Sequence, residues 1–506
     1  MKSYRSVGIF LFVVALLYLP FLGNAFVSDD SSIIAMGDPH RTWVDAIGLP
    51  SAVHLGSLIH YGIYHIFGPV PWPYRLVNIL FHAANATIVW LIVRKHARPR
   101  VAFVAGLLFA IHPLAVESVT WIAGGVVYAY SAFFFLLSLY WYRHVSRVKR
   151  IASLLSFIVA LCLSDKVMSL SMIFGLYEWM FGDLKKYWKH WIPYIAVTIP
   201  FVLFYITGLG TRISSVLAMS DRPGVPPENL FFQLPFAVSS YIELFVWPRH
   251  LTLYHVGVIH SWTEVAVRTA LTCVYLAVTL VGLVRKKLWG FWLAWVGIAL
   301  GVTLLPIRIA WIVAERYVYL GYIGFCVVAA ILFDRIVSLR KWELVGTCVG
   351  IIILIALCTR TMIRNSEWRS GDSLWVATLR ESPEDAKSWN NMGDVYSRHA
   401  EFDKSIEAFT QATKINPKYA DAYHNIGNTL VEMKKYDEAV PYFEKALSIN
   451  PNLWQSYQEL AAIAAEKKEY QQALRYIEQA LAINPADVSL QENAQGLRNA
   501  LGGSQR

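Results

Sequence analysis

Two adjacent carboxylates, Asp29 and Asp30, stand just past the first apolar run of the chain, Val7 to Leu22. At about 1.5 Å per residue, such a run is about long enough to cross a bilayer core of about 30 Å. Both carboxylates are therefore expected at a membrane face, where they could act as a general acid/base pair. The other interpretation is a solvated loop or helix cap, because Asp and Ser favour helix N-caps.

Further ionisable residues are expected on the same side of the membrane. Glu117 falls at the end of a predicted span, where an ionisable group is costly and by default functional, although its side chain could also reach water. His112, His255 and His260 could hold a divalent cation together with Glu117, or serve as ordinary hydrogen-bonding residues. No cofactor is expected to be required, and a divalent cation stays an option.

The elements that must position these residues are membrane helices. The chain has 506 residues, of which 56% are hydrophobic and 16% charged, and its mean hydropathy is +0.42. In so apolar a chain the net charge of +10 is better explained by basic cytoplasmic loops than by a nucleic-acid partner. Placing every basic cluster in the cytoplasm predicts eleven spans, with the N-terminus inside and everything after Thr359 outside. None of the five cysteines has CxxC spacing, so neither a metal site nor a disulfide framework is expected.

One apolar segment, Phe231 to Trp247, resists this assignment. It contains Pro235 and Glu243, and a span here would place the basic cluster Arg285-Lys286-Lys287 outside. We therefore expect a helix that lies in the outer interface or dips into it.

The C-terminal part carries an internal repeat. Pro383, Pro417, Pro451 and Pro485 are each 34 residues apart, which is the period of tetratricopeptide repeats (TPRs). Large and small residues recur at matching positions, as Trp389 and Gly393, Tyr423 and Gly427, and Tyr457 and Ala461. We predict a linker over residues 361–385, followed over residues 386–506 by three repeats and a capping helix.

Four asparagines fall on the first helices of their repeats, which line the concave face of such a stack. They are Asn390, Asn391, Asn425 and Asn428. They are either solvated positions or donors and acceptors for the backbone of an extended peptide.

An Asp-Asp pair after the first of many spans, followed by externally placed TPRs, resembles the transmembrane-and-TPR O-mannosyltransferase family of GT-C glycosyltransferases. Beyond Asp29-Asp30, the resemblance rests on four stretches: Tyr74 to His82, Phe109 to Val119, Ala314 to Leu320, and Arg360 to Trp368. Two places depart from the family pattern: Asp165-Lys166 stands where Lys-Glu is expected, and Gly48-Leu49-Pro50 replaces Arg-Pro-Leu. The short chain looks more like a prokaryotic member than a eukaryotic one.

The resemblance implies an all-α protein with a GT-C-type bundle of about eleven transmembrane helices over residues 1–360. It implies an inverting transfer of a mannose-like hexose from a polyprenyl-phosphate donor to a hydroxyl acceptor, expected to be Ser or Thr of a polypeptide bound by the repeats. The reaction would take place on the extracytoplasmic side of the inner membrane, or in the ER membrane of a eukaryote. The partners are then the lipid-linked sugar, the acceptor polypeptide and the bilayer.

The resemblance also implies residue roles. Asp29 or Asp30 is the base, and Asp29 is preferred because it is the first acidic residue after the span. Glu117 and His112 position the acceptor or substrate. Basic residues are expected to bind the donor phosphate: Arg316, and as weaker candidates Lys166 and Arg212. Arg316 could instead be a membrane-interface anchor paired with Glu315.

Two other classes of function compete with an enzyme. A non-enzymatic TPR scaffold anchored in the membrane could assemble envelope complexes, but eleven spans exceed what anchoring needs. A transporter would be expected to show charges near span midpoints or internally repeated broken helices. Neither pattern is clear in this chain.

Overall fold

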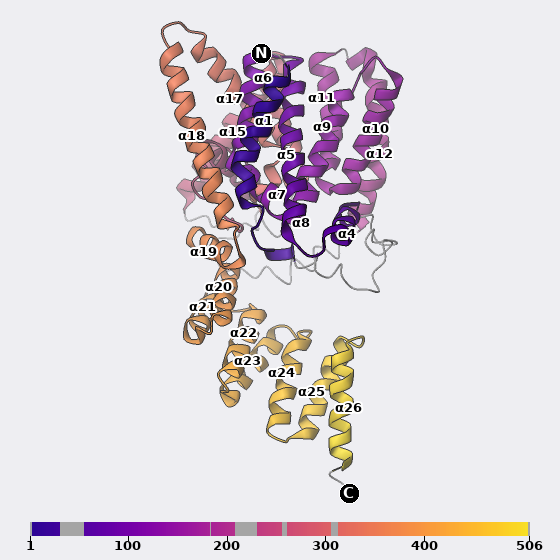
Figure 1. Ribbon diagram of the computed structural model, residues 1–506, viewed down its shortest axis with the longest axis vertical. Coiled ribbons are helices and arrows are strands. Elements are labelled where there is room, and N and C mark those ends of the chain that lie inside the picture. Colours follow the sequence, from indigo (N-terminus) through magenta and orange to yellow (C-terminus); the bar gives the residue numbers. More distant parts are fainter. Residues whose placement is uncertain are drawn as a thin grey trace. The chain divides into compact units, whose positions relative to one another are not determined.

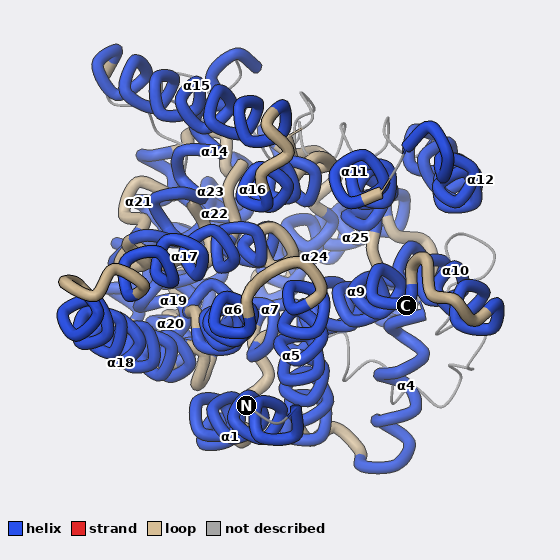
Figure 2. Tube along the Cα trace, turned by 90° about the horizontal axis from the view of Figure 1, so that it is seen from above, coloured by secondary structure: helices blue, strands red, loops and turns tan. Residues whose placement is uncertain are grey.

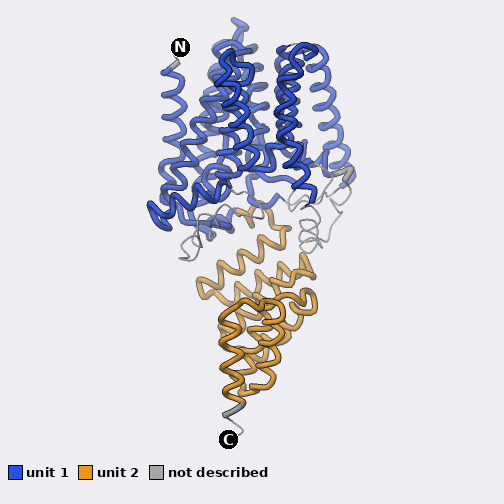
Figure 3. Tube along the Cα trace, turned by 90° about the vertical axis from the view of Figure 1, so that its right-hand side faces the viewer, with its two compact units in different colours: residues 1–217, 225–377 blue, residues 218–224, 378–506 orange. Residues whose placement is uncertain are grey.

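The computed structural model describes residues 3–30, 55–182, 184–207, 230–255, 261–304 and 312–503. Within these ranges the chain is helical, and its only β-type pairing is an isolated antiparallel bridge between His255 and Val313. The predicted all-α class is confirmed. Two compact units divide the chain, the first extending to residue 377 and the second following from residue 378 (Figure 3). Helices α18 (Glu343–Glu367) and α19 (Gly371–Glu381) run through much of the segment that we interpreted as a linker.

The first unit is a bundle in which some helices are buried and others present apolar side chains outward. Figure 2 looks along most of these helices, with α6 near the middle and α12, α15 and α18 at the periphery. Only 11%, 22% and 11% of the most apolar windows of α12, α15 and α18 are buried, against 61% for α5. An apolar helix face left open in this way is suited to lipid.

The helices of the bundle have the following bounds (Figure 1). The first part comprises α1 (Ser3–Tyr18), α4 (Leu55–Phe67), α5 (Pro71–Arg94), α6 (Pro99–Ile111), α7 (Val116–Thr120), α8 (Ile122–Gly125), α9 (Ser131–Trp141) and α10 (Arg147–Leu163). The second part comprises α11 (Ser171–Phe181), α12 (Leu184–Thr207), α14 (Leu230–Val246), α15 (Trp262–Val284), α16 (Leu288–Ala299), α17 (Tyr322–Val337) and α18.

Six helices in the described part of the chain are long and apolar enough to cross a membrane, or seven if one bent pair counts as a span. We predicted eleven. The difference arises because several predicted spans are shorter than 18 residues: α10, α11, α16 and α17 have 17, 11, 12 and 16 residues. Helix α14 covers most of the segment expected at the interface, has 17 residues and contains Pro235.

The bent pair joins α6 to α7 at an angle of 54°. His112 has an extended backbone conformation, as expected of a residue that precedes proline, and Pro113 begins a short 3-10 turn. The ring Nδ1 of His112 accepts a hydrogen bond from the main-chain N–H of Leu114 at 3.3 Å. Helix α7 follows this break, and its Glu117 is buried.

The second unit stacks helix pairs with the predicted repeat. Its helices are α20 (Ala386–Arg398), α21 (Phe402–Ile415), α22 (Ala420–Glu432), α23 (Tyr436–Ile449), α24 (Trp454–Glu466), α25 (Tyr470–Ile483) and α26 (Val488–Gly503). A Cβ atom on Gly393 would lie 2.5 Å from the Phe409 ring, and one on Gly427 would lie 2.7 Å from the Phe443 ring. The small residues of the pattern therefore allow the two helices of a repeat to approach.

Candidate functional site

The segment that carries the Asp pair is held through its main chain by Arg75, in the first turns of α5. This arginine is 1% exposed. It donates from Nη1 to the carbonyls of Leu22, at 3.3 Å, and Asn24, and from Nε to the carbonyl of Thr120 at 3.1 Å. Arg75 thus ties the chain after α1 to the end of α7. This gives a physical role to one of the four stretches on which the resemblance rests.

Asp29 and Asp30 lie in different environments, although they are neighbours in one 3-10 turn, Ser28–Asp30. Asp30 is fully buried, and its carboxylate accepts hydrogen bonds from the main-chain N–H groups of Val27, at 3.1 Å, and Ala123, at 2.9 Å. Burial raises the pKa of Asp30 to about 6, against the opposing effect of these two bonds and of Arg75. Asp29 is exposed. Asp30 therefore fastens the turn to α8, while Asp29 faces outward.

The buried carboxylate of Glu117 pairs with Arg316, in the 3-10 turn Glu315–Val318. The main-chain N–H of Arg316 donates to Glu117 Oε2 at 2.9 Å, and its guanidinium donates to Oε1. Arg316 keeps 11% of its side chain exposed, and its guanidinium carbon lies 5.5 Å from the Trp121 ring centroid and 5.0 Å from that of Tyr317. The partner that we anticipated for Arg316, Glu315, is engaged elsewhere.

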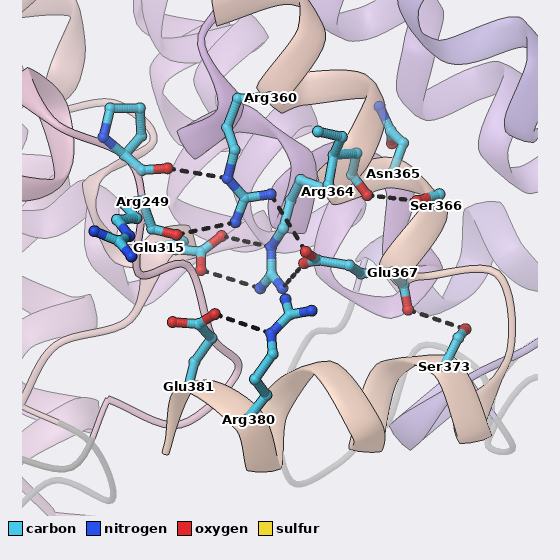
Figure 4. Close-up of polar contacts among 12 residues, drawn as sticks. Arg249, Glu315, Arg360, Arg364, Asn365, Ser366, Glu367, Ser373, Arg380 and Glu381 are labelled. Carbon is cyan, nitrogen blue, oxygen red and sulfur yellow. Dashed lines mark hydrogen bonds and ion pairs between the residues drawn. The ribbon is translucent and has the colours of Figure 1, made fainter. Parts of the chain in front are cut away.

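Glu315 belongs to a second ion network, shown in Figure 4. Arg364 of α18 is fully buried and donates from Nε and Nη2 to the two oxygens of Glu315, at 3.2 and 3.0 Å. Its Nη1 donates to Glu367 at 2.7 Å, and Glu367 also accepts from Arg360 at 3.3 Å. Together with the Glu117–Arg316 pair, the site holds three carboxylates and three guanidinium groups. Buried charges in proteins are normally paired in this way.

A neighbouring residue of the network, Asn365, links the first and last described helices of the bundle. Its Nδ2 donates to the Leu17 carbonyl of α1 at 3.3 Å, and its Oδ1 accepts from the Thr120 hydroxyl. The Asn24 side chain donates to the Asn365 carbonyl at 3.2 Å. These contacts bring the Asp turn, the end of α7 and the ion network together at one end of the bundle, where α1 and α18 end and α5 begins.

Lys166 and Arg316 lie against the same aromatic ring. Lys166 Nζ is 5.6 Å from the centroid of Tyr317, and the ammonium also pairs with Asp165 at 3.3 Å. Tyr128 packs nearby, with its ring centroid 6.5 Å from that of Tyr317. It lies in a π-helical turn, Val126–Tyr130, a feature frequent at functional sites. Sequence reasoning did not single out Tyr128, since no residue pattern marks such a turn.

The histidines have structural partners. His112 Nδ1 is an acceptor, so its Nε2 carries the proton and donates to the Phe245 carbonyl at 3.0 Å. His255 Nε2 lies 3.7 Å from Glu315 Oε1, so His255 lies beside Glu315, while Glu117 is bound by Arg316. In the described part of the chain, no three His, Cys, Asp or Glu residues are grouped to hold a metal ion. His260 and Arg212 fall outside the described residues.

The asparagines of the second unit join successive first helices. Asn425 donates to Asn390 at 3.0 Å, which links α22 to α20. Asn428 contacts His424 at 3.0 Å, and the other ring nitrogen of His424 contacts Ser456 of α24 at 2.9 Å. Asn391 Nδ2 and Asn428 Oδ1 are buried and have no hydrogen-bond partner among the described residues. Both amides thus keep hydrogen-bonding capacity that the stack does not use.

Comparison with known proteins covers both units. Residues 55–207 match the family described as dolichyl-phosphate-mannose-protein mannosyltransferase. Residues 401–434, 420–453 and 455–487 match tetratricopeptide-repeat families.

Three curated proteins that are similar to the chain are all described as protein O-mannosyl-transferases. Protein O-mannosyl-transferase TMTC3 of Mus musculus is 24% identical over 479 residues, which cover 82% of this chain and 51% of the relative. The Homo sapiens protein of the same name is 24% identical and covers 68% of this chain and 42% of its own length. Protein O-mannosyl-transferase F38B6.6 of Caenorhabditis elegans is also 24% identical, and the match covers 64% of this chain and 47% of that relative. The chain thus spans about half the length of the curated relatives that it matches.

Among solved structures, "First TPR of Spaghetti (RPAP3) bound to HSP90 peptide SRMEEVD" is 18% identical, with a TM-score of 0.23. It covers 24% of this chain and 97% of its own. "Crystal structure of MamA protein" is 16% identical, with a TM-score of 0.24, and the match covers 26% of this chain and 72% of the solved chain.

Proposed function

We propose that this chain, which is homologous to the transmembrane-and-TPR O-mannosyltransferases, is an integral membrane glycosyltransferase of the GT-C type. It transfers a mannose-like hexose from a polyprenyl-phosphate donor to a hydroxyl group, that of Ser or Thr in a polypeptide. The observation that carries this proposal is one exposed carboxylate, Asp29, on a turn fastened to α8, with the cation Arg316 packed on Trp121 just before α8.

The chemistry assigns one task to each of these groups. Asp29 takes the proton of the acceptor hydroxyl as the oxygen forms its bond to the anomeric carbon of the sugar. The bond between that carbon and the phosphate oxygen breaks on the opposite face, and its electron pair leaves with the phosphate, which inverts the anomeric centre. Arg316 and Lys166 stabilise the negative charge on the leaving phosphate.

Glu117 and Asp30 act as positioning residues. Glu117 binds both the main chain and the guanidinium of Arg316, which sets the direction of that side chain. Asp30 uses both carboxylate oxygens on main-chain N–H groups, so it orients the turn that presents Asp29. A preorganised site of this kind avoids the free-energy cost of reorganising its groups during the reaction.

The positions of the basic clusters support a proposed orientation in the membrane. The site lies at the start of α5, where Arg75 is buried, whereas the other end of α5 carries Arg94 and is followed by Lys95. Basic residues favour the cytoplasmic side, so the site and the repeats would lie outside the cytoplasm, in the inner membrane of a prokaryote or the ER membrane of a eukaryote. A reporter that is active only outside the cytoplasm, fused after Arg506, should then be active.

The repeats are proposed to bind the acceptor polypeptide. Asn391 and Asn428 are half-buried residues of first helices, and amide side chains there carry the kinds of donor and acceptor that the backbone of an extended peptide needs.

The activity is tested by mass spectrometry of glycoproteins from cells with and without the gene, together with sugar transfer by the purified protein in vesicles. Hexose on Ser or Thr should disappear without the gene and form with the purified protein. Glycoproteins that are unchanged in these cells would instead favour a scaffold without enzymatic activity.

A further inference from the structure

An open cleft of about 550 Å³ lies between α14 and α15, two helices that pack against each other. Figure 2 shows the two helices next to each other. The cleft has two chemically distinct parts. Most of its lining is apolar, including Ile242, Val246, Val267 and Leu271. The remainder is a cluster of charged and hydroxyl side chains.

Arg268 is the centre of the polar part. Its Nε donates to Glu264 at 2.7 Å, and its Nη1 donates to the hydroxyls of Ser239 and Ser240 at 3.1 and 3.2 Å. Both serines are buried, and 20% of the Arg268 side chain is exposed. The guanidinium is therefore held in one orientation at the wall of the cleft.

Glu243 is the second charged group of the cleft and is bound more weakly. Its Oε2 lies 3.9 Å from Arg268 Nη1, and its side chain is 58% exposed. Because Glu264 already neutralises the guanidinium at 2.7 Å, the three side chains leave one negative charge on the outer side of the cleft. A lone phosphate would be repelled by this charge.

The surroundings indicate that the cleft opens to the bilayer at head-group depth. The apolar residues at its rim are strongly exposed: Val246, Val267 and Leu271 at 71%, 55% and 48%. Trp247 and Trp262, at the ends of α14 and α15 beside the cleft, are 67% and 76% exposed. Tryptophans gather where membrane meets water, so they mark the polar end of the cleft as interfacial.

We propose that this cleft binds a bilayer phospholipid whose head group ends in a primary ammonium, such as phosphatidylethanolamine. The phosphate contacts the Arg268 guanidinium and Ser239, the ammonium donates to Glu243, and an acyl chain lies along the apolar lining. A zwitterion of this kind adds no net charge to the cleft, and its ammonium provides a partner for the excess carboxylate. An anionic head group would leave Glu243 without a partner, and a trimethylammonium group cannot donate a hydrogen bond to it.

This lipid site is separate from the proposed donor site. The side chain of Tyr241 points away from Ser239 and Glu243 around α14, and its hydroxyl donates to the Ala314 carbonyl at 3.4 Å, next to Glu315. One helix, about 10 Å across, therefore stands between the cleft and Arg316. The proposal does not depend on the transferase activity.

The test is native mass spectrometry of the full chain in detergent, with equal amounts of dioleoyl phosphatidylethanolamine, phosphatidylglycerol and phosphatidylcholine. We expect preferential retention of phosphatidylethanolamine. Glu243→Gln removes one charge-assisted hydrogen bond and should lower that preference about tenfold. Because Glu243 is largely exposed, this variant should fold. Arg285→Gln, at the other end of α15, is the matched control and should retain the lipid as the wild type does.

Three results would overturn the proposal. The first is equal retention of the three lipids by the wild type. The second is an unchanged preference in Glu243→Gln. The third is preferential binding of phosphatidylglycerol, which would assign the cleft to an anionic lipid and rule out the role given to Glu243.

Discussion

Arg316 occupies both oxygens of Glu117, one with its main-chain N–H at 2.9 Å and the other with its guanidinium. A single buried carboxylate thus fixes the backbone and the side chain of the same residue. The remaining N–H groups of the guanidinium fork keep a defined direction, as binding of a phosphate requires.

Substitution of Arg316 should lower kcat/KM for the donor, because Arg316 both binds the phosphate and stabilises the charge that develops on it. Arg316→Lys keeps the charge and the main-chain bond to Glu117 but loses the planar fork, so we expect kcat/KM to fall about tenfold. Arg316→Gln also loses the charge, and the fall should reach about a hundredfold, in line with charge-assisted hydrogen bonds of roughly 1.5–3 kcal/mol. Steady-state transfer at varied donor concentration measures both values. Lys341→Gln, an exposed cation before α18, serves as the control; equal effects in all three variants would contradict the assignment.

The two aspartates should respond differently to the same substitution. Asp29→Asn should slow single-turnover transfer by roughly 10²–10⁴ without loss of stability, because an amide cannot take the proton. Asp30→Asn should lower the free energy of unfolding by about 1–3 kcal/mol, because the amide cannot accept from both Val27 and Ala123. Rates and thermal unfolding of both purified variants separate the two roles. Wild-type transfer by Asp29→Asn would remove Asp29 as the base.

The stability of the Asp30 turn should depend on pH. The pKa of Asp30 rises from its ordinary value of 3.8 to about 6 in the folded protein, so the folded state binds the proton more tightly than the unfolded state. The resulting stabilisation is complete below pH 3.8 and is lost as the pH rises through 6. Between pH 5 and pH 7, the wild type should therefore gain stability at the lower pH relative to Asp30→Asn, by at most about 1.4 kcal/mol per pH unit. A difference in Tm that does not change with pH would exclude this shift.

Removing Arg364 alone should lower the free energy of unfolding more than removing Arg364 and Glu315 together. Arg364→Gln leaves the buried Glu315 without its fork, and breaking a buried pair costs about 3–5 kcal/mol. The double variant Arg364→Gln with Glu315→Gln removes both charges and should recover part of the loss. Thermal unfolding of the single and double variants measures the coupling. Additive losses would mean that the two side chains do not stabilise each other.

Deletion of residues 386–506 should separate the two units in function. We expect transfer to a protein acceptor to be lost, while the membrane unit still binds the donor, because the contacts of Arg316 and Asp30 lie within residues 1–377. Transfer to a protein and donor binding are measured on the same preparation. Undiminished transfer to the protein would point to a lipid or free-glycan acceptor.

The repeats could be predicted almost completely, because periodicity is a local signal. The turns confirm the period as well: Ala400, Lys434 and Lys468 all adopt the left-handed conformation at 34-residue intervals. The ion pairs of the membrane unit could not be predicted in the same way. Glu315 and Arg316 are adjacent, yet their partners Arg364 and Glu117 are 49 and 199 residues away in the sequence. Only the packed bundle decides which neighbour each charge meets.

The same limit applies to the Asp pair. The apolar run before Asp29 and Asp30 indicated a membrane face, and the preference for Asp29 as the base came from the family resemblance. The burial of Asp30 depends on the main-chain N–H of Ala123, which exists as a free donor because α8 begins at Ile122. A helix start formed 93 residues later is not visible in the turn itself.

The contacts of Asn365 have a consequence for the order of events during synthesis. They connect α18 to the end of α1, across 348 residues of chain. The Leu17 carbonyl and the Asn24 amide obtain these partners only after α18 has left the ribosome and entered the bilayer. Until then the first helix can insert, but the turn behind it lacks one of its supports. A nascent chain that stops before α18 should therefore leave Asp29 unoriented, so the machinery would become competent only once nearly all of the membrane unit has been made.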